Sequence, residues 1–373
     1  MTFEPVFVLP LSFAVAFLTS FGLTPLVAVV ARRHGFVDRP SPRRDGVLKP
    51  RLGGVAVYIA LVMALALTYP LLPGRTGAEM GRVAGLLLGG GVVVVIGALD
   101  DRFELPALAQ LAGQVLAAAI ALAGGILIDQ LTNPFASGLG DSLLNFPLYL
   151  AVFFTFFWLL GSMNTMNFLD GVDGLAAGVA AVAAAVLAVH SLELGQITIG
   201  LLPLALAGAC LGFLPFNFYP ARITLGTCGS VFLGFSLGAL SVIGGTKAAT
   251  LLLVLGLPVV DTGWTIARRM ASGQSPMRGD RGHLHHRLLA LGLSERQIVL
   301  LMYGASVALG ALALLLSTRL AKFYALGIMT AATLLLVATL AYYGKRQSIK
   351  QVEEGPPAHS FGGPQGTAPR RGP

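Results

Sequence analysis

Long apolar segments with almost no charge follow one another along this 373-residue chain, and they constrain its fold more than any other feature. A helix needs roughly 20 mostly apolar residues to cross the hydrocarbon core of a bilayer. Only 11% of the residues are charged, whereas a soluble domain has about 25%. The sequence therefore predicts an all-α fold, a polytopic membrane helix bundle, rather than a water-soluble globule.

Eleven segments are candidates for spanning helices, and ten is the alternative because the third, fifth and eighth are short. The first starts beside an acidic residue and lacks a small-residue cleavage site, so we interpret it as a retained helix and not as a signal peptide. We expect one membrane-embedded domain over 1–343 and a disordered cytoplasmic tail, rich in Pro, Gly and charge, over 344–373. The candidate spans are about 6–31, 53–72, 82–99, 106–128, 147–163, 175–190, 198–214, 229–243, 248–267, 298–316 and 322–343.

Lys and Arg are divided unequally between the two sets of loops, which predicts the orientation of the chain. With the N-terminus outside, 20 of the 25 basic residues fall on the cytoplasmic side. Cytoplasmic loops of membrane proteins carry such an excess, so we expect this orientation, and the net charge of +8 has the same origin. Nucleic acid is therefore not expected as a partner. Cys210 and Cys228 are interpreted as small buried residues and not as a disulfide.

The chemically suggestive residues all fall on the predicted cytoplasmic side, at or near helix ends. Channels and transporters place polar residues at mid-bilayer, whereas the predicted spans are almost free of them. One polar, charged face and one plain face are typical of an enzyme that works at the membrane surface.

Two groups of acidic and amide side chains could carry chemistry. Asp100 and Asp101 are adjacent carboxylates, whose repulsion a hard divalent ion such as Mg²⁺ relieves. The alternative is an acidic first turn that caps a helix. A second group recurs every three residues beside two glycines, which gives a polar stripe in a helical turn; one such residue could be a cap, but not all four. These residues are Asn164, Asn167, Asp170 and Asp173.

Three further segments are polar or basic. Asn217 precedes a Gly/Pro-rich stretch that reaches Thr227 and Ser230, which could bind a ligand or be a loop with interfacial aromatic residues. In the first loop Lys49 and Arg51 lie beside a Gly-Gly pair and could attract phosphates or anionic membrane lipid, although topology alone explains most of this charge. In the last segment the mixture of Arg and His suits a diphosphate better than structural zinc. Its candidate residues are Arg278, Arg281, His283, His285 and His286.

Together these motifs resemble those of the polyprenyl-phosphate N-acetylhexosamine-1-phosphate transferases, a glycosyltransferase family. The matching stretches are Asp100-Asp101, 164–175, 217–230 and 283–286, and they occur in the family's order over most of the membrane region. The His-Leu-His-His form of the last motif resembles the undecaprenyl-phosphate GlcNAc-1-phosphate branch, which starts lipopolysaccharide, teichoic acid and related cell-wall glycans. The muramoyl-pentapeptide branch typically has three consecutive histidines.

This sequence departs from the family pattern at two places. The family usually has an Asp that binds magnesium where this chain has Thr227, a hydroxyl that adds no charge. The first loop also lacks a His that the family often carries before the Pro-Arg-x-Gly-Gly turn. The first departure leaves open three possibilities: another carboxylate compensates, metal affinity is lower, or the chain is a non-catalytic or transport member that binds polyprenyl phosphate.

The resemblance implies that a lipid phosphate attacks the β-phosphorus of a UDP-sugar and releases UMP, in the bacterial inner (plasma) membrane. Its implied partners are the UDP-sugar, undecaprenyl phosphate and membrane lipid, with a homodimer as one possible assembly. Another sugar, including phospho-MurNAc-pentapeptide, is an alternative substrate.

By the same resemblance, Asp101 and Asp173 hold Mg²⁺, or alternatively Mn²⁺, with help from Thr227, and Asp100 assists the metal or the lipid phosphate. Asp170, Asn217 and Lys49 contact uridine. The implied catalytic set is Asp100, Asp101, Asp173, His283, His285 and His286, and the substrate-binding set is Lys49, Arg51, Asn164, Asn167, Asp170, Asn217, Arg278 and Arg281.

Overall fold

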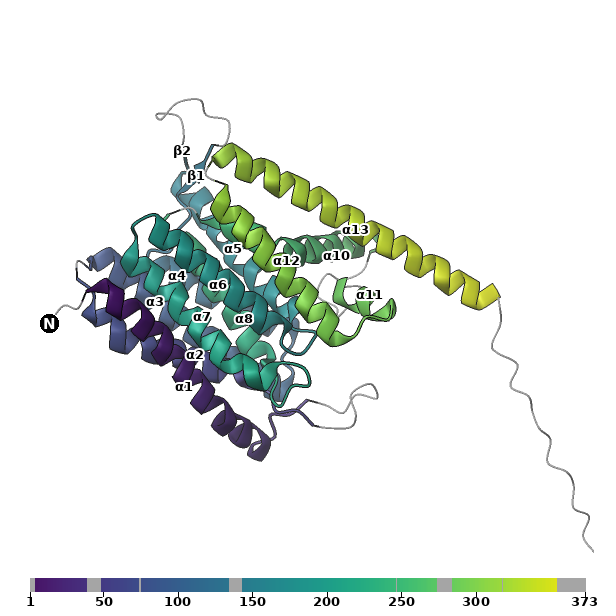
Figure 1. Ribbon diagram of the computed structural model, residues 1–373, viewed down its shortest axis with the longest axis horizontal. Coiled ribbons are helices and arrows are strands. Elements are labelled where there is room, and N and C mark those ends of the chain that lie inside the picture. Colours follow the sequence, from purple (N-terminus) through teal and green to yellow (C-terminus); the bar gives the residue numbers. More distant parts are fainter. Residues whose placement is uncertain are drawn as a thin grey trace, which may run out of the picture.

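Helices make up nearly all of the regular structure in the computed structural model, which describes residues 4–38, 48–73, 75–133, 143–245, 247–273, 284–316 and 318–353 (Figure 1). In chain order they are α1 (Pro5–Arg33), α2 (Gly53–Thr68), the 3-10 helix η1 (Tyr69–Leu71), α3 (Gly77–Phe103), α4 (Ala107–Ala123), α5 (Leu148–Leu169), α6 (Leu175–Glu193), α7 (Ile197–Asn217), α8 (Gly226–Val242), α9 (Ala248–Val254), α10 (Gly256–Ala271), α11 (Leu284–Ala290), α12 (Glu295–Leu315) and α13 (Arg319–Glu353). Two short strands, β1 (Gln130–Thr132) and β2 (Leu143–Asn145), pair antiparallel between α4 and α5.

Eight helical segments in the described ranges are long and apolar enough to cross a membrane: α1, α2 continued by η1, α3, α5, α6, α7, α12 and α13. Helices α9 and α10 pass the same test as a pair that is bent by 83°, and α4 and α8 are shorter apolar helices. The predicted polytopic helix bundle is confirmed, and each candidate span overlaps a helix. Two of the segments expected to be short, α3 and α5, are 27 and 22 residues long. Hydropathy missed the ends of α3 because a Thr76–Glu79 capping box starts it and Asp100 to Arg102 lie in its last turn.

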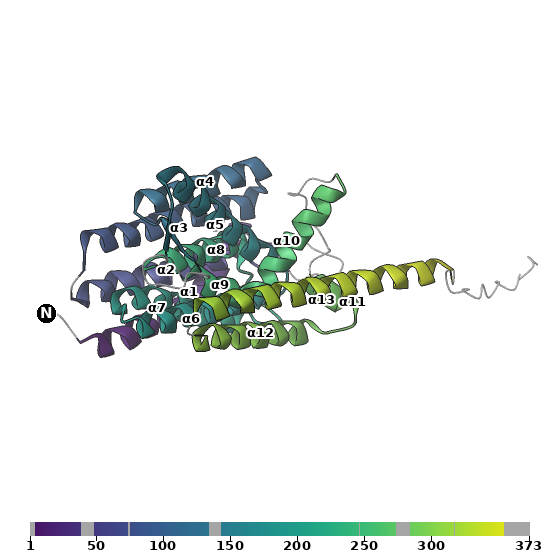
Figure 2. The same cartoon turned by 90° about the horizontal axis from the view of Figure 1, so that it is seen from above.

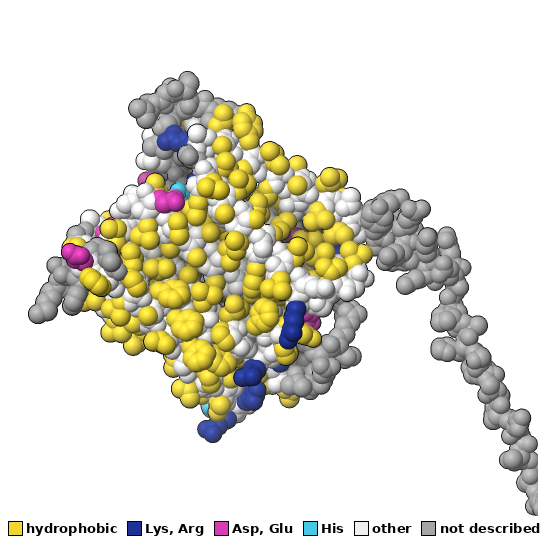
Figure 3. All heavy atoms as spheres, in the orientation of Figure 1, with side chains coloured by type: hydrophobic (Ala, Val, Ile, Leu, Met, Phe, Trp, Pro, Cys, Tyr) yellow, Lys and Arg dark blue, Asp and Glu magenta, His cyan; other side chains and the backbone are white. Residues whose placement is uncertain are grey.

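The flank of the bundle is covered by hydrophobic side chains, and the Lys and Arg side chains visible on it lie toward its edges (Figure 3). Large apolar residues such as Phe7 and Leu18 on α1 and Phe157 on α5 are exposed. A soluble monomer rarely exposes so large an apolar area. The flank therefore has the surface that a bilayer requires.

Helix α8 forms the centre of the bundle and contacts α2, α3, α5 and α6. All of its residues except Thr227 and Val242 are buried. Glycines let the neighbouring backbones approach it closely: a Cβ on Gly97 of α3 would lie 2.4 Å from the Cα of Cys228. Small residues at helix contacts are typical of membrane bundles. This contact fixes the C-terminal part of α3 against the first turn of α8.

The C-terminal part departs from the sequence-based expectation in one respect. Helix α13 passes Gly344 and continues to Glu353, so the first residues of the predicted disordered tail are helical. Residues 354–373 lie outside the described ranges. The disorder of the rest of the tail stays a prediction. As predicted, Cys210 and Cys228 are both buried, and neither forms a disulfide.

Candidate active site

An extended segment that contains Lys49 and Arg51 lies across the ends of several helices. The Lys49 carbonyl accepts the Asp38 N–H at 2.9 Å, and the Arg51 N–H donates to the Phe36 carbonyl at 2.8 Å. On the other side, the Pro50 carbonyl accepts the Thr224 N–H at 2.9 Å. Alternate residues of an extended chain point to the same side, so the two cationic side chains are presented together. The backbone of this segment is held on both edges.

Asp101 lies one turn after Gly97 on α3 and caps the N-terminus of α8. Its two carboxylate oxygens accept the backbone N–H groups of Thr227, at 2.9 Å, and Cys228, at 3.1 Å. The N-terminus of a helix carries partial positive charge, which stabilises an anion. Gly226 has a φ of 76°, and a Cβ there would lie 2.5 Å from Asp101 Oδ2. The close approach of this buried carboxylate therefore requires glycine at 226.

Asp173 lies in the turn between α5 and α6 and is almost fully buried. Its Oδ2 is 2.5 Å from the Lys49 ammonium nitrogen and accepts the Ala221 N–H at 3.0 Å. Gly174, with a φ of 82°, ends the turn and starts α6. The glycine-rich motif of the sequence thus bends the chain so that Asp173 meets the first loop.

Arg51 connects two carboxylates. Its Nε lies 3.0 Å from Asp38 Oδ1 and 3.6 Å from Asp101 Oδ1. Asp38 was not among the predicted site residues. The signal that could have identified it is a carboxylate in the same basic loop, but its position depends on the pairing of Val37 with Pro50.

A polar cavity of about 280 Å³ lies between these groups. Asn217 reaches it from the end of α7: its Nδ2 donates to the Ile223 carbonyl at 3.0 Å, while its Oδ1 is buried and has no hydrogen-bond partner. A buried acceptor without a partner costs free energy unless a ligand supplies a donor or a cation. The residues that line the cavity are Asp38, Arg51, Asn167, Asp170, Val172, Asp173, Asn217, Thr224, Gly226, Thr227 and Ser230.

A second and larger cavity, of about 820 Å³, is lined mainly by apolar residues of α4, α5, α9 and α10. It shares Asn167 and Asp170 with the polar cavity. Asn164 lines only this second cavity, and its side-chain amide donates to Gln114 Oε1 at 3.0 Å. The apolar and the polar cavity therefore meet at the end of α5.

Asp170 lies at this junction, immediately after α5. Burial raises its pKa well above the ordinary value for a carboxyl group, and the nearby carboxylate of Asp101 adds to the effect, whereas Arg51 opposes it. A ligand cation in the polar cavity would favour the ionised form of this group.

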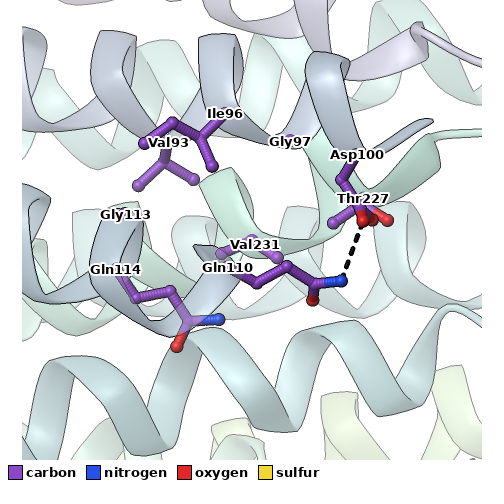
Figure 4. A pocket seen from close by; sticks show the side chains of 9 residues that line it. All are labelled: Val93, Ile96, Gly97, Asp100, Gln110, Gly113, Gln114, Thr227 and Val231. Atoms are coloured by element: carbon purple, nitrogen blue, oxygen red, sulfur yellow. Dashed lines mark hydrogen bonds between the residues drawn. The ribbon is translucent and has the colours of Figure 1, made fainter. Parts of the chain in front are cut away.

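Asp100 does not share the position of its neighbour Asp101. Its Oδ1 accepts the Leu105 N–H at 2.9 Å and Gln110 Nε2 at 2.8 Å, so it closes the turn between α3 and α4. Figure 4 shows Asp100 beside Thr227 at a small cavity of about 20 Å³. Thr227 lines this cavity as well as the polar one. Asp100 therefore does not line the polar cavity. Thr227 lies between the two cavities and links Asp100 to the predicted metal carboxylates.

The histidine motif falls largely outside the described residues, which include none of Arg278, Arg281 and His283. His285 and His286 belong to α11. The start of this helix is held by Asp261 of α10, whose Oδ1 accepts the Leu284 N–H at 3.0 Å. Asp261 is buried within the predicted span 248–267, an ionisable residue in a segment predicted to be apolar.

The donor set suits Mg²⁺ in its chemistry, because carboxylate, amide and hydroxyl oxygens are hard ligands. Asn217 Oδ1 offers a buried oxygen without a partner. Within the described residues, no three His, Cys, Asp or Glu side chains lie close enough together to hold a metal. Asp101 and Asp173 instead face Arg51 and Lys49. Metal binding at these carboxylates therefore requires that the cationic side chains give way.

Comparison with known proteins gives a consistent result. Residues 83–245 match the model of glycosyl transferase family 4. The chain is 33% identical over 300 residues to a probable undecaprenyl-phosphate N-acetylglucosaminyl 1-phosphate transferase of Bacillus subtilis, which covers 78% of this chain and 80% of the relative. It is 34% identical to a decaprenyl-phosphate N-acetylglucosaminephosphotransferase of Mycolicibacterium smegmatis, over 77% of each chain. It is also 35% identical to a phospho-N-acetylmuramoyl-pentapeptide-transferase of Desulforudis audaxviator, over 80% of this chain and 95% of the relative.

Proposed function

The chain belongs to glycosyl transferase family 4, among the polyprenyl-phosphate sugar-1-phosphate transferases, and from this premise we propose that it transfers GlcNAc-1-phosphate from UDP-GlcNAc to undecaprenyl phosphate. An oxygen of the lipid phosphate attacks the β-phosphorus of UDP-GlcNAc. The bond between that phosphorus and the bridging oxygen breaks, and UMP leaves with the oxygen. The product is undecaprenyl diphospho-GlcNAc.

The observation that carries this proposal is the junction of the two cavities. The apolar cavity between α4, α5, α9 and α10 suits a polyprenyl chain, and the polar cavity suits a nucleotide sugar. Asn167 and Asp170 line both, so the two phosphates meet there. Positioning two anionic reactants in line is the main task of a catalyst for phosphoryl transfer.

The side chains around the polar cavity supply the charges that this reaction needs. Arg51 lines the cavity and Lys49 contacts the lining residue Asp173, so both cations can attract the diphosphate, and the Oδ1 of Asn217 accepts a hydrogen bond from the nucleotide. Asp101, Asp173 and Thr227 are the residues that would hold Mg²⁺, or Mn²⁺ in its place. When bound, the metal neutralises charge on the diphosphate. A lipid phosphate with a second pKa of about 6 is already mostly ionised near neutral pH, so no general base is required.

The reaction takes place at the cytoplasmic surface of the inner membrane, where UDP-sugars are found. The distribution of Lys and Arg supports an N-terminus outside and eleven spans, in which α4, α8 and the bent pair of α9 and α10 add to the eight long helices.

Phospho-MurNAc-pentapeptide transfer is the second candidate, and the likeness to the Desulforudis audaxviator enzyme supports it. The experiment is to incubate the purified protein with undecaprenyl phosphate, Mg²⁺ and one UDP-sugar at a time, and to measure UMP. We expect release with UDP-GlcNAc and not with UDP-MurNAc-pentapeptide. Release with the second substrate alone would favour the second candidate, and no release with any UDP-sugar would indicate a non-catalytic protein.

A further inference from the structure

Two cationic side chains occupy the carboxylates to which the proposed function assigns the metal. The Lys49 ammonium lies 2.5 Å from Asp173 Oδ2, and the two side chains are 15% and 3% exposed. Arg51 lies between Asp38 and Asp101, whose side chain has no exposed surface. A buried carboxylate needs such a partner, because leaving it ionised and unpaired is costly.

We infer that Lys49 is an exchangeable counterion, which neutralises Asp173 while no metal is bound and releases it to a divalent cation when the site fills. Arg51 does the same for Asp101 to a smaller degree, because the longer distance of 3.6 Å and the N–H groups of α8 leave that carboxylate less dependent on it. This inference rests on the proposed function, in which Asp173 is a metal ligand.

The geometry allows the exchange without a change in the fold. The backbone on both sides of Lys49 is held by hydrogen bonds between Asp38 N–H and the Lys49 carbonyl and between Thr224 N–H and the Pro50 carbonyl. Only the four-carbon side chain of Lys49 has to rotate, which is a fast motion for a lysine. The ammonium group then remains beside the polar cavity, where it can meet the diphosphate of the substrate.

The exchange makes the lysine a competitor of the metal. The Lys49 ammonium contacts Asp173 Oδ2 and stabilises its ionised form, so it must be displaced before a metal can bind the same oxygen. The protein without nucleotide therefore binds the metal more weakly than it would if Asp173 had no cationic partner. An anionic nucleotide that attracts Lys49 lowers this competition, so metal and UDP-sugar bind with positive coupling.

The test measures Mn²⁺ binding to the purified full chain without nucleotide or lipid, from the signal of free Mn²⁺ in electron paramagnetic resonance. We expect Lys49→Met to lower the Kd for Mn²⁺ by about tenfold, which corresponds to the loss of one strong charge contact. Lys49→Arg keeps the cation and should stay near the wild type. Arg33→Gln removes an exposed cation from the last turn of α1 and controls for net charge.

Thermal unfolding gives a second measurement, which can be made even on a variant of lower stability. Without metal, Lys49→Met should melt below the wild type, because Asp173 is left buried without its cation. Saturating Mn²⁺ should then raise its Tm by more than it raises that of the wild type.

The outcomes separate the inference from the proposed function. If Asp173→Asn weakens Mn²⁺ binding while Lys49→Met leaves the Kd and the Tm increment unchanged, or weakens binding, the exchange is refuted and the metal assignment stands. If Asp173→Asn leaves Mn²⁺ binding unchanged, the metal assignment fails and the exchange fails with it.

Discussion

Replacing Thr227 by Asp restores the residue that the family usually carries and tests the metal site directly. The backbone N–H of Thr227 lies 2.9 Å from Asp101 Oδ1, so a carboxylate at 227 would lie close to the one at 101. At a separation on the order of 5 Å and an effective dielectric constant of about 20, two such charges repel by about 3 kcal/mol. The partial positive charge at the N-terminus of α8 offsets about 0.3–1 kcal/mol of this repulsion.

The substitution should therefore destabilise the metal-free protein and make it depend more on metal. We expect Thr227→Asp to lower the Tm without Mg²⁺ and to enlarge the rise in Tm when Mg²⁺ is added. A third carboxylate adds a full charge to a site for a hard ion. The Mg²⁺ concentration that half-saturates UMP release should fall, by about tenfold, and turnover should rise.

Thr227→Asn is the matched control, because it has the size of Asp without its charge. Titrations of UMP release and of Tm with Mg²⁺ are run on the three proteins side by side. If Thr227→Asp changes neither the half-saturating concentration nor the Tm increment, Thr227 does not face the metal. If it lowers activity, another residue already fills the ligand position and the added charge only repels. An inactive wild type with an active Thr227→Asp would identify a disabled member of the family.

Three further predictions concern other described residues and the motif on α11. Asp173→Asn should reduce UMP release by at least ~10²-fold, comparable to the loss of one strong electrostatic element, while the protein stays folded in detergent; activity near wild type would refute its role. Cysteines placed at Asp100, Asp173 and His285 should not react with an impermeant reagent added to intact cells, and labelling at any one would contradict the cytoplasmic site. The pKa of Asp170 in the folded protein is raised, whereas a carboxyl group in an unfolded chain has a pKa of about 4. Ionisation of Asp170 therefore lowers the stability of the protein as the pH rises from about 4 through the raised pKa. Asp170→Asn cannot ionise, so its Tm without metal should exceed that of the wild type above this range, and equal melting temperatures there would contradict the shift.

The helices of the bundle could be predicted from sequence because the bilayer demands long apolar runs, and these runs are local. The bend between α9 and α10 could not be predicted in this way. The segment 248–267 is one continuous apolar run by hydropathy, although it is divided at Leu255 and Gly256. Asp261 on the second half is buried and holds the start of α11, a contact that no local pattern contains.

The site was predicted in part, for a related reason. Lys49, Arg51, Asp101, Asp173 and Thr227 meet because their motifs lie at helix ends on one side of the bundle. Asp100 and Asp101 are adjacent in the sequence, but their side chains contact different helices. Consecutive residues of a helix point about 100° apart, since a turn has 3.6 residues. One carboxylate therefore caps α8, and the other closes the turn to α4.

The position of Asp38 depends on contacts between segments that are distant in the chain or separated by a loop. Its carboxylate meets Arg51 because Val37 pairs with Pro50 across the first loop. Hydrophobic periodicity carries no information on that pairing. The same is true of the junction between the two cavities, which α4, α5, α9 and α10 build together with the residues around α8.

The transfer of the β-phosphorus distinguishes the proposed reaction from transfer of the sugar alone, and an isotope label follows it directly. The purified protein is incubated with undecaprenyl phosphate, Mg²⁺ and UDP-GlcNAc that carries ³²P in the β-phosphate, and the lipid and nucleotide fractions are separated. We predict that the label appears in the lipid fraction and that the released UMP is unlabelled. Label that stays in the nucleotide fraction as UDP, with the sugar on the lipid, would show transfer of the sugar alone and would contradict it.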